Sequence, residues 1–384
     1  MKRYVVISGF NINANNRGTA ALGYGAVSFC QEYGYLHEGQ ELLTIKFVKK
    51  FWKKQYRDNS ENHKSCGKTW KCHTIHVCVL EQFLLNKFRL ALPFTKFGRL
   101  IREIETVACI NGGDGFSDIY GTRIFHSRLP EIKMAMSYGI PVIQLPQTLG
   151  PFKDNRNFCI AKDILRYSKD IYVRDEKFIP ELEKLGVKYI LTKDLSAYMQ
   201  PEPWNIDIKP NSIGINVSGL AYSNRFHALS GQFDVYPELI DRLICHFRNK
   251  GHFVYLIPHS YNYANPELNN DDMVACRAAY EKLCDKSNVI VVDKDMISPQ
   301  VKYVISKMSF FIGTRMHANF AAIYTNVPLF GLAYSWKFEG AFDANGLEGK
   351  KQTANINSID KMEIDDIIMK INQVYLEFTN INAN

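Results

Sequence analysis

The chain has 384 residues, of which 46% are hydrophobic and 22% are charged, and its formal net charge is +8 at pH 7. These proportions are those of folded globular proteins, and they exclude disordered and fibrous chains. The length exceeds that of a single hydrophobic core, so we expect two domains. The positive charge favours anionic partners, namely phosphorylated metabolites, anionic lipid or nucleic acid.

Short β-branched runs alternate with helix-length amphipathic segments, which is typical of βαβ units and parallel sheets. In the first half, strands are expected at residues 4–8, 107–111, 141–145, 171–174 and 188–191. In the second half, strands are expected at residues 213–217, 253–257, 289–292, 310–313 and 328–332. The sequence therefore predicts an α/β fold made of two similar halves.

Prolines interrupt this pattern at residues 201–210, where we place an interdomain linker. The linker separates a first domain, residues 1–203, from a second domain, residues 211–358. Residues 359–384 have helical spacing and are expected to form a C-terminal helical tail that packs across the first domain.

Residues 49–99 break the rhythm, because they are rich in Lys, Arg, Phe and Trp and contain few acids. We interpret them as a basic insertion in the first domain. Within it, residues 82–90 and 94–100 pair basic with aromatic side chains, as interfacial helices do. Two interpretations stay open: a packed helix with a solvated basic face, or peripheral contact with a membrane or a lipid-linked acceptor. Nucleic acid is not expected, since no recognisable nucleic-acid motif accompanies the charge.

The cellular compartment is indicated by what the chain lacks. No apolar run approaches the roughly 20 residues that cross a bilayer, and residues 1–9 turn glycine-rich too early for a signal peptide. The nine cysteines are scattered, mostly on apolar segments, which suits reduced core thiols. We expect a cytoplasmic protein, with the basic insertion allowing peripheral contact at the inner face of the membrane.

Open α/β sheets bind ligands beyond the carboxyl ends of their strands, so the residues that follow each strand are the first candidates. After the strand at 310–313, Arg315 and His317 stand in the first turn of a helix, whose free N–H groups favour an anion. Arg315 offers a fork for carboxylate or phosphate, and His317 a proton donor near neutral pH. Lys337 follows the next strand and adds a second positive charge. The structural alternative makes Arg315 a surface ion-pair partner and His317 a core histidine.

Other polar residues follow strands of the second half and are candidates for binding the same ligand. His259 and Ser260 follow the strand at 253–257, and Ser218 and Gly219 follow the domain's first strand. Small residues there permit close approach of the backbone to a ligand. His259 is expected either to assist phosphate binding or to make a hydrogen bond within its loop.

In the first half, a glycine-rich turn with two carboxylates comes directly after a strand. Its candidate residues are Asn111, Gly112, Gly113, Asp114 and Asp118. The turn lacks both the GxGxxG spacing of dinucleotide sites and the Lys-Ser/Thr ending of a P-loop. Asp114 or Asp118 is expected to orient or deprotonate a sugar hydroxyl, with helix capping as the alternative.

Two further strand ends supply polar side chains. Gln147 is suited to reading sugar hydroxyls, whereas Arg174 is expected either to point at the ligand or to hold Asp175 in place. Asp194 is a comparable acidic residue for which a capping role is equally open. A metal site is not expected at Cys66, Cys72, His73, His76 and Cys78, because the CxxC pairs of structural zinc sites are absent.

These motifs, taken in chain order, carry a family resemblance. They are Gly112-Gly113-Asp114-Gly115, Gln147-Thr148-Leu149-Gly150-Pro151, Val173-Arg174-Asp175, Asp194, Ile257-Pro258-His259, Gly313-Thr314-Arg315-Met316-His317-Ala318 and Tyr334-Ser335-Trp336-Lys337. In order and spacing they resemble the polysaccharide pyruvyl transferase family over residues 4–340. The most specific element is Gly-x-Arg-x-His-Ala.

The resemblance implies a GT-B-like fold, with two Rossmann-like domains facing across a cleft, and phosphoenolpyruvate as donor substrate with no cofactor. Two departures stand out. The family often has Gly-Asn-x-Gly-Asp-Glu after its first strand, whereas residues 15–20 here read Asn-Asn-Arg-Gly-Thr-Ala without the acids. Asp114 also stands where a third glycine is common.

The implied reaction moves the carbon unit of phosphoenolpyruvate onto a sugar as a pyruvate ketal, in the biosynthesis of a surface polysaccharide such as a capsule or exopolysaccharide. His317 is the expected acid. The second domain is expected to hold the donor through Arg315, Lys337, His259, Ser218, Gly219, Ser260 and Tyr334. The first domain is then expected to bind the acceptor sugar. One candidate acceptor is a lipid-linked oligosaccharide. The alternatives are a GT-B glycosyltransferase with a nucleotide-sugar donor and a non-catalytic descendant of the enzyme.

Overall fold

The computed structural model describes residues 2–52, 57–65, 67–226, 229–335 and 337–381. The chain divides into two compact units. The first consists of Met1–Ile12 and Leu22–Met199, and the second of Asn13–Ala21 and Gln200–Asn384. The division after Met199 lies beside the predicted linker, whereas the assignment of Asn13–Ala21 to the second unit was not expected from the sequence.

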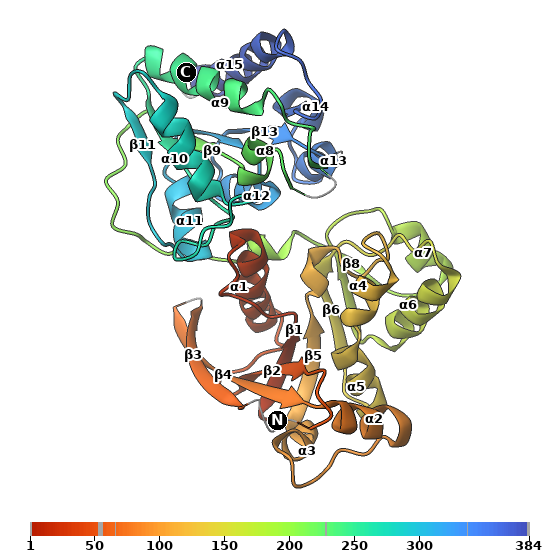
Figure 1. Cartoon of the computed structure of the whole chain (residues 1–384). Helices are drawn as coiled ribbons and strands as arrows, with labels where there is room; N and C mark the ends of the chain where they lie inside the picture. The colour runs from red at the N-terminus through yellow and green to blue at the C-terminus, as the bar shows by residue number, and fades with distance from the viewer. Residues whose placement is uncertain (1, 53–56, 66, 227–228, 336, 382–384) are drawn as a thin grey trace. The chain divides into compact units, whose positions relative to one another are not determined.

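The first unit is built on an eight-stranded sheet of order β3-β4-β2-β1-β5-β6-β7-β8, visible in Figure 1. Every pairing is parallel except that of β3 with β4. The strands are β1 (Tyr4–Ser8), β2 (Glu41–Phe47), β3 (Asn59–Ser65), β4 (Lys68–Val77), β5 (Ile104–Cys109), β6 (Val142–Gln147), β7 (Asp170–Val173) and β8 (Ile190–Leu191). Without the edge strand β3, the order is 3-2-1-4-5-6-7 in sequence, which is the Rossmann arrangement with β8 added at one edge.

Helices cover both faces of this sheet, so its central strands are buried on both sides. The alternation in β1 shows this, because Val6 packs into one core and Val5 into the other. One face carries α2 (Val79–Phe88), α3 (Lys96–Leu100), α4 (Thr122–Ser127), α5 (Pro130–Tyr138), α6 (Asn155–Tyr167) and α7 (Ile179–Lys184). The other face carries α1 (Arg17–Glu32), through Leu22, Ala26 and Phe29.

The interpretation of residues 49–99 as an insertion is wrong in its first half. β4 lies beside β2 in parallel register, with Ile45 opposite Ile75, and it supplies the third strand of the Rossmann order. Basic side chains such as Lys68 and Lys71 are exposed on β4, while Trp70, Cys72 and Ile75 are buried. The basic composition therefore concealed a half-buried strand with an apolar inner face. Only α2 and α3 correspond to the predicted helices.

The second unit is a six-stranded, wholly parallel sheet of order β11-β10-β9-β12-β13-β14. This is again 3-2-1-4-5-6 in sequence, so both predicted halves are Rossmann-like. The strands are β9 (Ser212–Asn216), β10 (Phe253–Leu256), β11 (Val289–Val291), β12 (Phe310–Gly313), β13 (Leu329–Ala333) and β14 (Thr353–Asn355). Its helices are α8 (Gly219–Ser223), α9 (Tyr236–Asn249), α10 (Asp272–Lys282), α11 (Ser298–Ile305), α12 (Met316–Ile323), α13 (Lys337–Asp343), α14 (Gly349–Gln352) and α15 (Glu363–Ile381).

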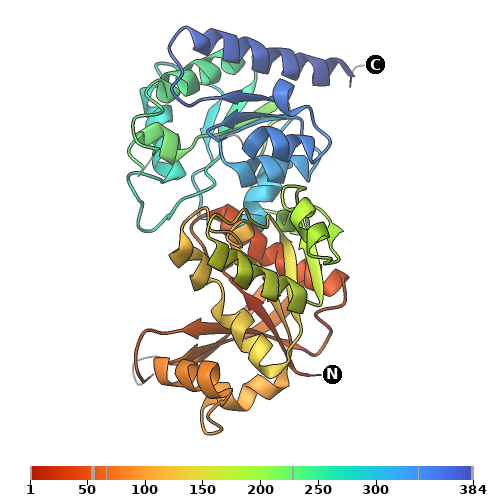
Figure 2. The same ribbon diagram turned by 90° about the vertical axis from the view of Figure 1, so that its right-hand side faces the viewer.

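Every strand predicted from the sequence overlaps an observed one, and the strands that were missed are β2, β3, β4 and β14. The tail is helical as predicted, but its expected packing on the first domain is wrong. Ile364, Ile368 and Ile371 of α15 are buried in the core of the second unit. Figure 2 shows α15 running beside α9, where the rings of Tyr375 and Phe247 lie 5.6 Å apart.

The state of the cysteines and the character of the helices can be given for the described residues. Over the ranges that the structure describes, all eight cysteines are free thiols; Cys66 lies outside those ranges. Within the same ranges, no helix combines the length and the apolar character needed to cross a bilayer.

Candidate functional site

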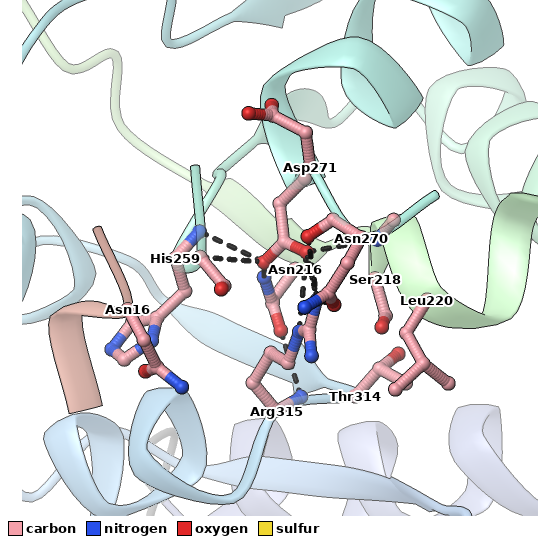
Figure 3. A network of polar contacts seen from close by, with 12 residues as sticks. Asn16, Asn216, Ser218, Leu220, His259, Asn270, Asp271, Thr314 and Arg315 are labelled. Carbon is pink, nitrogen blue, oxygen red and sulfur yellow. Dashed lines mark hydrogen bonds and ion pairs between the residues drawn. The ribbon is translucent and has the colours of Figure 1, made fainter. Parts of the chain in front are cut away.

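The best candidate site lies at the topological switch point of the second unit. There the strand order reverses between β9 and β12, and ligands of open α/β sheets bind beyond the carboxyl ends of the strands at such a point. Figure 3 shows the side chains of Asn216, Asn270, His259 and Arg315 gathered at this point. Asn216 is the last residue of β9, and its Oδ1 accepts a hydrogen bond from the backbone N–H of Arg315 at 2.8 Å. The two strands of the switch point are thus tied together at the site.

Asp272 holds the site together, and sequence reasoning missed it. Its carboxylate is completely buried at the start of α10. It accepts hydrogen bonds from the backbone N–H groups of Gly219 (2.8 Å), His259 (3.0 Å) and Ser260 (2.9 Å). It also accepts from Nε (3.1 Å) and Nη2 (2.7 Å) of Arg315. One carboxylate therefore fixes the loops that follow β9, β10 and β12.

Arg315 forms a buried ion pair, which differs from the surface pair considered as the alternative. The residue is 8% exposed, and its Nη2 donates to Oδ1 of Asn270 at 2.7 Å as well as to Asp272. Burial lowers the pKa of Arg315, but the charge and hydrogen bond of Asp272, together with Tyr334 and Tyr236, outweigh it and raise the pKa overall. The guanidinium is a permanent, oriented cation at the end of β12.

His259 is buried beside several basic groups. Its backbone N–H donates to Asp272, and its carbonyl accepts from the N–H of Arg17 at 3.0 Å. Burial lowers the pKa of His259 well below its ordinary value of 6.5. Three neighbours lower it further: His317, Arg315 and Arg17. His259 is therefore neutral at pH 7 in a strongly positive environment, and an anion bound there would relieve the repulsion.

His317 lies in the first turn of α12, packed against the start of α1. A Cβ on Gly18 would stand 2.7 Å from the imidazole ring of His317, closer than any real contact. Only glycine at this position leaves room for the ring. The edge of Phe320 also meets the imidazole, with ring centroids 5.6 Å apart. Gly18, which sequence reasoning passed over, is thus a positioning residue for His317.

Arg17 anchors the beginning of α1 in the second unit. Its Nε donates to the carbonyl of Met296 at 2.7 Å, and its guanidinium lies 4.3 Å from the centre of the Tyr261 ring. The Arg17 carbonyl accepts from Oγ of Ser298 at 2.6 Å. Asn16 caps the helix, since its Oδ1 accepts from the N–H of Gly18 at 2.9 Å. Residues 15–20, where the chain departs from the family pattern, therefore form part of this site.

The remaining donor-side candidates fall into two groups. Ser218 and Gly219 lie at the site: Ser218 is fully buried, and within the part of the chain that the structure describes its Oγ has no hydrogen-bond partner. A Cβ on Gly219 would lie 2.3 Å from the carbonyl oxygen of Asp271, so glycine is required there. Ser260 is buried and bonded to Asp272. Tyr334 is partly buried and packs against Phe338, and the side chain of Lys337 lies outside the described part of the chain.

In the first unit, the glycine turn at 111–115 lies at the corresponding switch point, after β5. Asn111, Gly112 and Gly113 all have positive φ, at 48°, 69° and 86°. A Cβ on Gly115 would lie 2.3 Å from the carbonyl oxygen of Asn111. The turn thus needs its glycines for backbone geometry. Asp114, which follows, accepts a hydrogen bond from the hydroxyl of Tyr120 at 2.8 Å.

The expectation that Gln147 reads sugar hydroxyls is wrong. The side chain is completely buried, and its amide donates to the carbonyls of Cys109 (3.2 Å) and Leu145 (3.0 Å). It accepts from the amide of Asn111 at 3.0 Å, and Asn111 also donates to Gln144. The amide of Gln147 is fully paired within the fold, and Nδ2 of Asn111 links the end of β5 to β6, whereas among the described residues Oδ1 of Asn111 has no hydrogen-bond partner.

Arg174 lies beside the glycine turn, since a Cβ on Gly113 would be 3.1 Å from its Nη1, and it is held by Asp194 instead of binding Asp175 directly. Its Nη1 donates to Asp194 at 2.6 Å and its Nε to Thr148 at 3.0 Å, while Asp175 pairs with Thr148. Burial tends to lower the pKa of Arg174, but Asp194 raises it more. Asp194 also accepts from the N–H of Ser196, so it is both an ion-pair partner and a cap.

Asp118 has a structural role instead of a catalytic one. Its carboxylate accepts from the backbone N–H groups of Lys153 (2.8 Å) and Asp154 (2.9 Å), and from the side chain of Asn157 (3.1 Å). Burial tends to raise the pKa of Asp118, but these hydrogen bonds outweigh it and lower the pKa. A carboxylate that already accepts several hydrogen bonds is a weak base. Asp118 is therefore poorly suited to deprotonate a sugar hydroxyl.

Glu131, in the first turn of α5, is an acid that sequence reasoning missed. Burial raises its pKa to about 7, although the Ser8 hydroxyl and the charge of Arg128 act in the opposite direction. Ser8 ends β1, so Glu131 lies by the switch point of the first unit. A carboxyl that titrates near neutral pH is suited to acid–base chemistry.

The two histidines of the segment 66–78 make hydrogen-bonding contacts with other side chains. His73 contacts Glu41 at 2.5 Å and Ser60 at 2.6 Å, and His76 contacts Asp58. Among the residues that the structure describes, no group of three His, Cys, Asp or Glu side chains is placed to hold a metal ion.

Comparison with known proteins decides the family. Residues 16–335 match the family model described as polysaccharide pyruvyl transferase. The chain belongs to the polysaccharide pyruvyl transferase family. The match begins at Asn16, which caps α1 at the site, and it includes Gly18, Asp272, Arg315 and His317. No curated protein matches the sequence.

Solved structures agree on the fold. The UDP-GlcNAc 2-epimerase from Methanocaldococcus jannaschii is similar with a TM-score of 0.52 at 9% identity, over 97% of this chain and 92% of that one. The UDP-GlcNAc 2-epimerase from Neisseria meningitidis, bound to UDP-GlcNAc, is similar with a TM-score of 0.50 at 12% identity, over 99% and 94% of the two chains. The fold of this transferase family member is therefore of the GT-B class.

The depressed pKa of His259 predicts how stability changes with pH. The unfolded chain binds a proton on this histidine near pH 6.5, whereas the folded protein does not. Stability is therefore fully present above about pH 6.5 and decreases as the pH falls below it. His259→Gln should flatten this decrease in a series of thermal melts. His246, whose pKa is also lowered by burial, is left in both proteins, so parallel curves would contradict the prediction.

Proposed function

We propose that the protein transfers the carbon unit of phosphoenolpyruvate to a sugar, forming a pyruvate ketal and releasing phosphate. A proton is added to the methylene carbon of the donor, and a sugar hydroxyl bonds to the central carbon. The bond from that carbon to the phosphate oxygen then breaks, and a second hydroxyl of the same sugar takes its place. Of the two protons that the sugar hydroxyls lose, one is accounted for in the new methyl group and the other in the released hydrogen phosphate.

The observation that supports this proposal most is the gathering of basic groups at the switch point of the second unit. Burial lowers the pKa of His259 most, and His317, Arg315 and Arg17 lower it further. Phosphoenolpyruvate carries a carboxylate and a phosphate, so it would complete this environment electrostatically. The buried, unpartnered Oγ of Ser218 is a further group for its oxygen atoms.

Within this proposal, His317 is the general acid that protonates the methylene carbon. Its position in the first turn of α12, beside Arg315, places a titratable group next to the oriented cation. Arg315 and His259 stabilise the negative oxygen atoms of the donor. Lys337 follows β13 in the sequence and is proposed as a further cation for the same donor.

The first unit is proposed to hold the sugar acceptor. Asp114 is available to orient a hydroxyl, and Glu131, with a pKa of about 7, can accept a proton from one. Arg128 lies next to the glycine turn, since a Cβ on Gly112 would be 3.3 Å from its Nη2. The acceptor class that we favour is a sugar of a growing surface polysaccharide, carried on a lipid or a nucleotide.

A nucleotide-sugar glycosyltransferase is the alternative, because the structurally similar epimerases include one bound to UDP-GlcNAc. Ligand protection against thermal unfolding distinguishes the two donors, because a ligand that binds only the folded state raises its stability. Phosphoenolpyruvate is expected to raise the melting temperature. A shift with nucleotide-sugars and none with phosphoenolpyruvate would contradict the proposal.

Arg315→Lys should weaken phosphoenolpyruvate binding by about tenfold or more, because lysine keeps the charge against Asp272 but loses the planar fork. Calorimetric titration measures the dissociation constant. Arg277→Lys is the matched control, since Arg277 forks onto Asp293 at 2.9 and 2.6 Å elsewhere in the same unit. Equal affinities in the two variants would remove Arg315 from the donor site.

His317→Gln should lower the rate of phosphate release by on the order of 10² to 10⁴, while phosphoenolpyruvate binding is largely retained. The reason is that glutamine can donate a hydrogen bond but cannot transfer a proton. Phosphate release is followed with phosphoenolpyruvate and a panel of sugar acceptors. A variant with near-normal turnover would show that another group is the acid.

Gly18→Ala should lower the rate while the fold keeps most of its stability. The new Cβ would stand 2.8 Å from Cβ of His317, so the histidine backbone itself must shift, and such overpacking costs about 1–3 kcal/mol. Alanine is favoured over glycine within a helix by about 1 kcal/mol, which offsets part of that cost. Gly340→Ala is the control, because nothing lies within 4 Å of that position in α13. A loss of stability in step with the loss of rate would point to misfolding instead.

A further inference from the structure

The first unit exposes a concentration of large apolar side chains around α2. The residues exposed by 40% or more in this region are Phe51 (70%), Trp52 (45%), Val79 (40%), Phe83 (50%), Phe88 (58%), Leu90 (49%) and Phe94 (66%). Single exposed apolar residues are ordinary on soluble proteins, but a group of this size marks an interaction surface. We call the exposed residues of 49–52 and 79–99 the aromatic-basic surface.

These side chains are neighbours in the fold, although they come from separate stretches. The strand extension at 48–51 runs along the start of α2, where the N–H of Val79 donates to the Lys50 carbonyl at 2.9 Å. The N–H of Leu80 donates to the Phe51 carbonyl at 3.3 Å. One turn further along α2, the rings of Phe83 and Phe88 meet edge to face, 6.1 Å apart. The backbone of Lys50 and Phe51 therefore lies beside the start of α2, and the exposed rings of Phe83 and Phe88 follow on the same helix.

The charge on this surface has one sign. It contains Lys49, Lys50, Lys87, Arg89, Lys96 and Arg99. The only acid in the sequence between 79 and 99 is Glu81, which is 2% exposed and accepts a hydrogen bond from the N–H of Cys78 at 3.1 Å. The ammonium group of Lys87 lies 5.5 and 5.4 Å from the ring centres of Phe83 and Phe88. Cations are thus interleaved with exposed rings, and no carboxylate is exposed among them.

We infer that the aromatic-basic surface docks on a bilayer that contains anionic phospholipid. Exposed rings and aliphatic side chains enter the boundary between headgroups and acyl chains, while lysine and arginine meet the lipid phosphates. A single-stranded nucleic acid also binds basic residues and stacking rings, but the exposed aliphatic side chains of Val79 and Leu90 favour insertion among acyl chains. The uniform positive charge is complementary to an anionic surface. This inference does not depend on the proposed function.

Vesicle flotation of the full chain tests the inference. The protein should float with vesicles of phosphatidylcholine containing about 30% phosphatidylglycerol, and much less with phosphatidylcholine alone, because about 1 kcal/mol per basic residue comes from the anionic lipid. Binding should weaken steeply as salt is added. Failure to bind the anionic vesicles would overturn the inference.

Two variants separate the contributions of charge and apolar contact. Lys87→Glu with Lys96→Glu and Arg99→Glu should reduce binding on the order of 100-fold. Phe88→Ser with Phe94→Ser should reduce it by about tenfold or more, because two inserted rings are lost. The control is Leu268→Ser with Met362→Ser in the second unit, whose side chains are 78% and 81% exposed. Its binding should equal that of the unaltered protein.

Other outcomes would assign the surface to a different partner. Equal vesicle binding by all variants would show that the lipid contact lies elsewhere on the protein. Concentration-dependent self-association in light scattering, abolished by the two serine substitutions, would mean that a second copy of the chain covers the surface. Tighter binding to single-stranded polynucleotide than to vesicles would point to nucleic acid. Because all substituted side chains are exposed or half-buried, unchanged thermal melts are expected and should be checked first.

Discussion

The candidate site depends on the buried ion pair of Asp272 and Arg315. Removing one partner of such a pair costs about 3–5 kcal/mol, because the other charge is left buried and unpaired. Here the same carboxylate also accepts the N–H groups of Gly219, His259 and Ser260, so the loops after three strands share one acceptor. The interaction that stabilises the switch point of the second unit is therefore the interaction that places its functional groups.

A consequence of this arrangement is that two paired cations and two imidazoles lie close together in a largely buried place. Asp272 pairs with Arg315 and Asp295 pairs with Arg17 at 3.3 Å, while Arg315, Arg17 and His317 all lower the pKa of His259. The protein relieves the repulsion by keeping His259 neutral, which costs stability only at acidic pH. An incoming dianion or trianion would meet a field that is already oriented and would need little reorganisation of the protein. This physical logic suits a donor that carries both carboxylate and phosphate.

The first unit repeats the Rossmann strand order, but its switch point is built differently. Amides replace charges in its interior, with Asn111, Gln144 and Gln147 bonded to one another, and Arg174 is held by Asp194. Glu131 is a titratable group near this point, on a helix that the sequence motifs did not highlight. Two units of one topology can thus serve different ligands, because the sites are grafted onto the same frame of strands.

The sequence by itself determined the α/β class, the positions of most strands and the placing of Arg315 and His317 after β12, since these follow from local periodicity and from the order of motifs along the chain. It also predicted the glycine turn at 111–115, because glycine is the residue that adopts positive φ without strain. It did not determine the roles of Gln147, Asp118 and Arg174, nor the joining of Gly18 to His317, because burial and partners depend on segments far apart in sequence. The basic strand β4 and the role of Asp272 as a shared acceptor were not predicted, because they too depend on contacts between segments far apart in sequence. A side chain's chemistry is written in the sequence, but what it pairs with, and whether it faces a ligand or the core, only the tertiary structure decided.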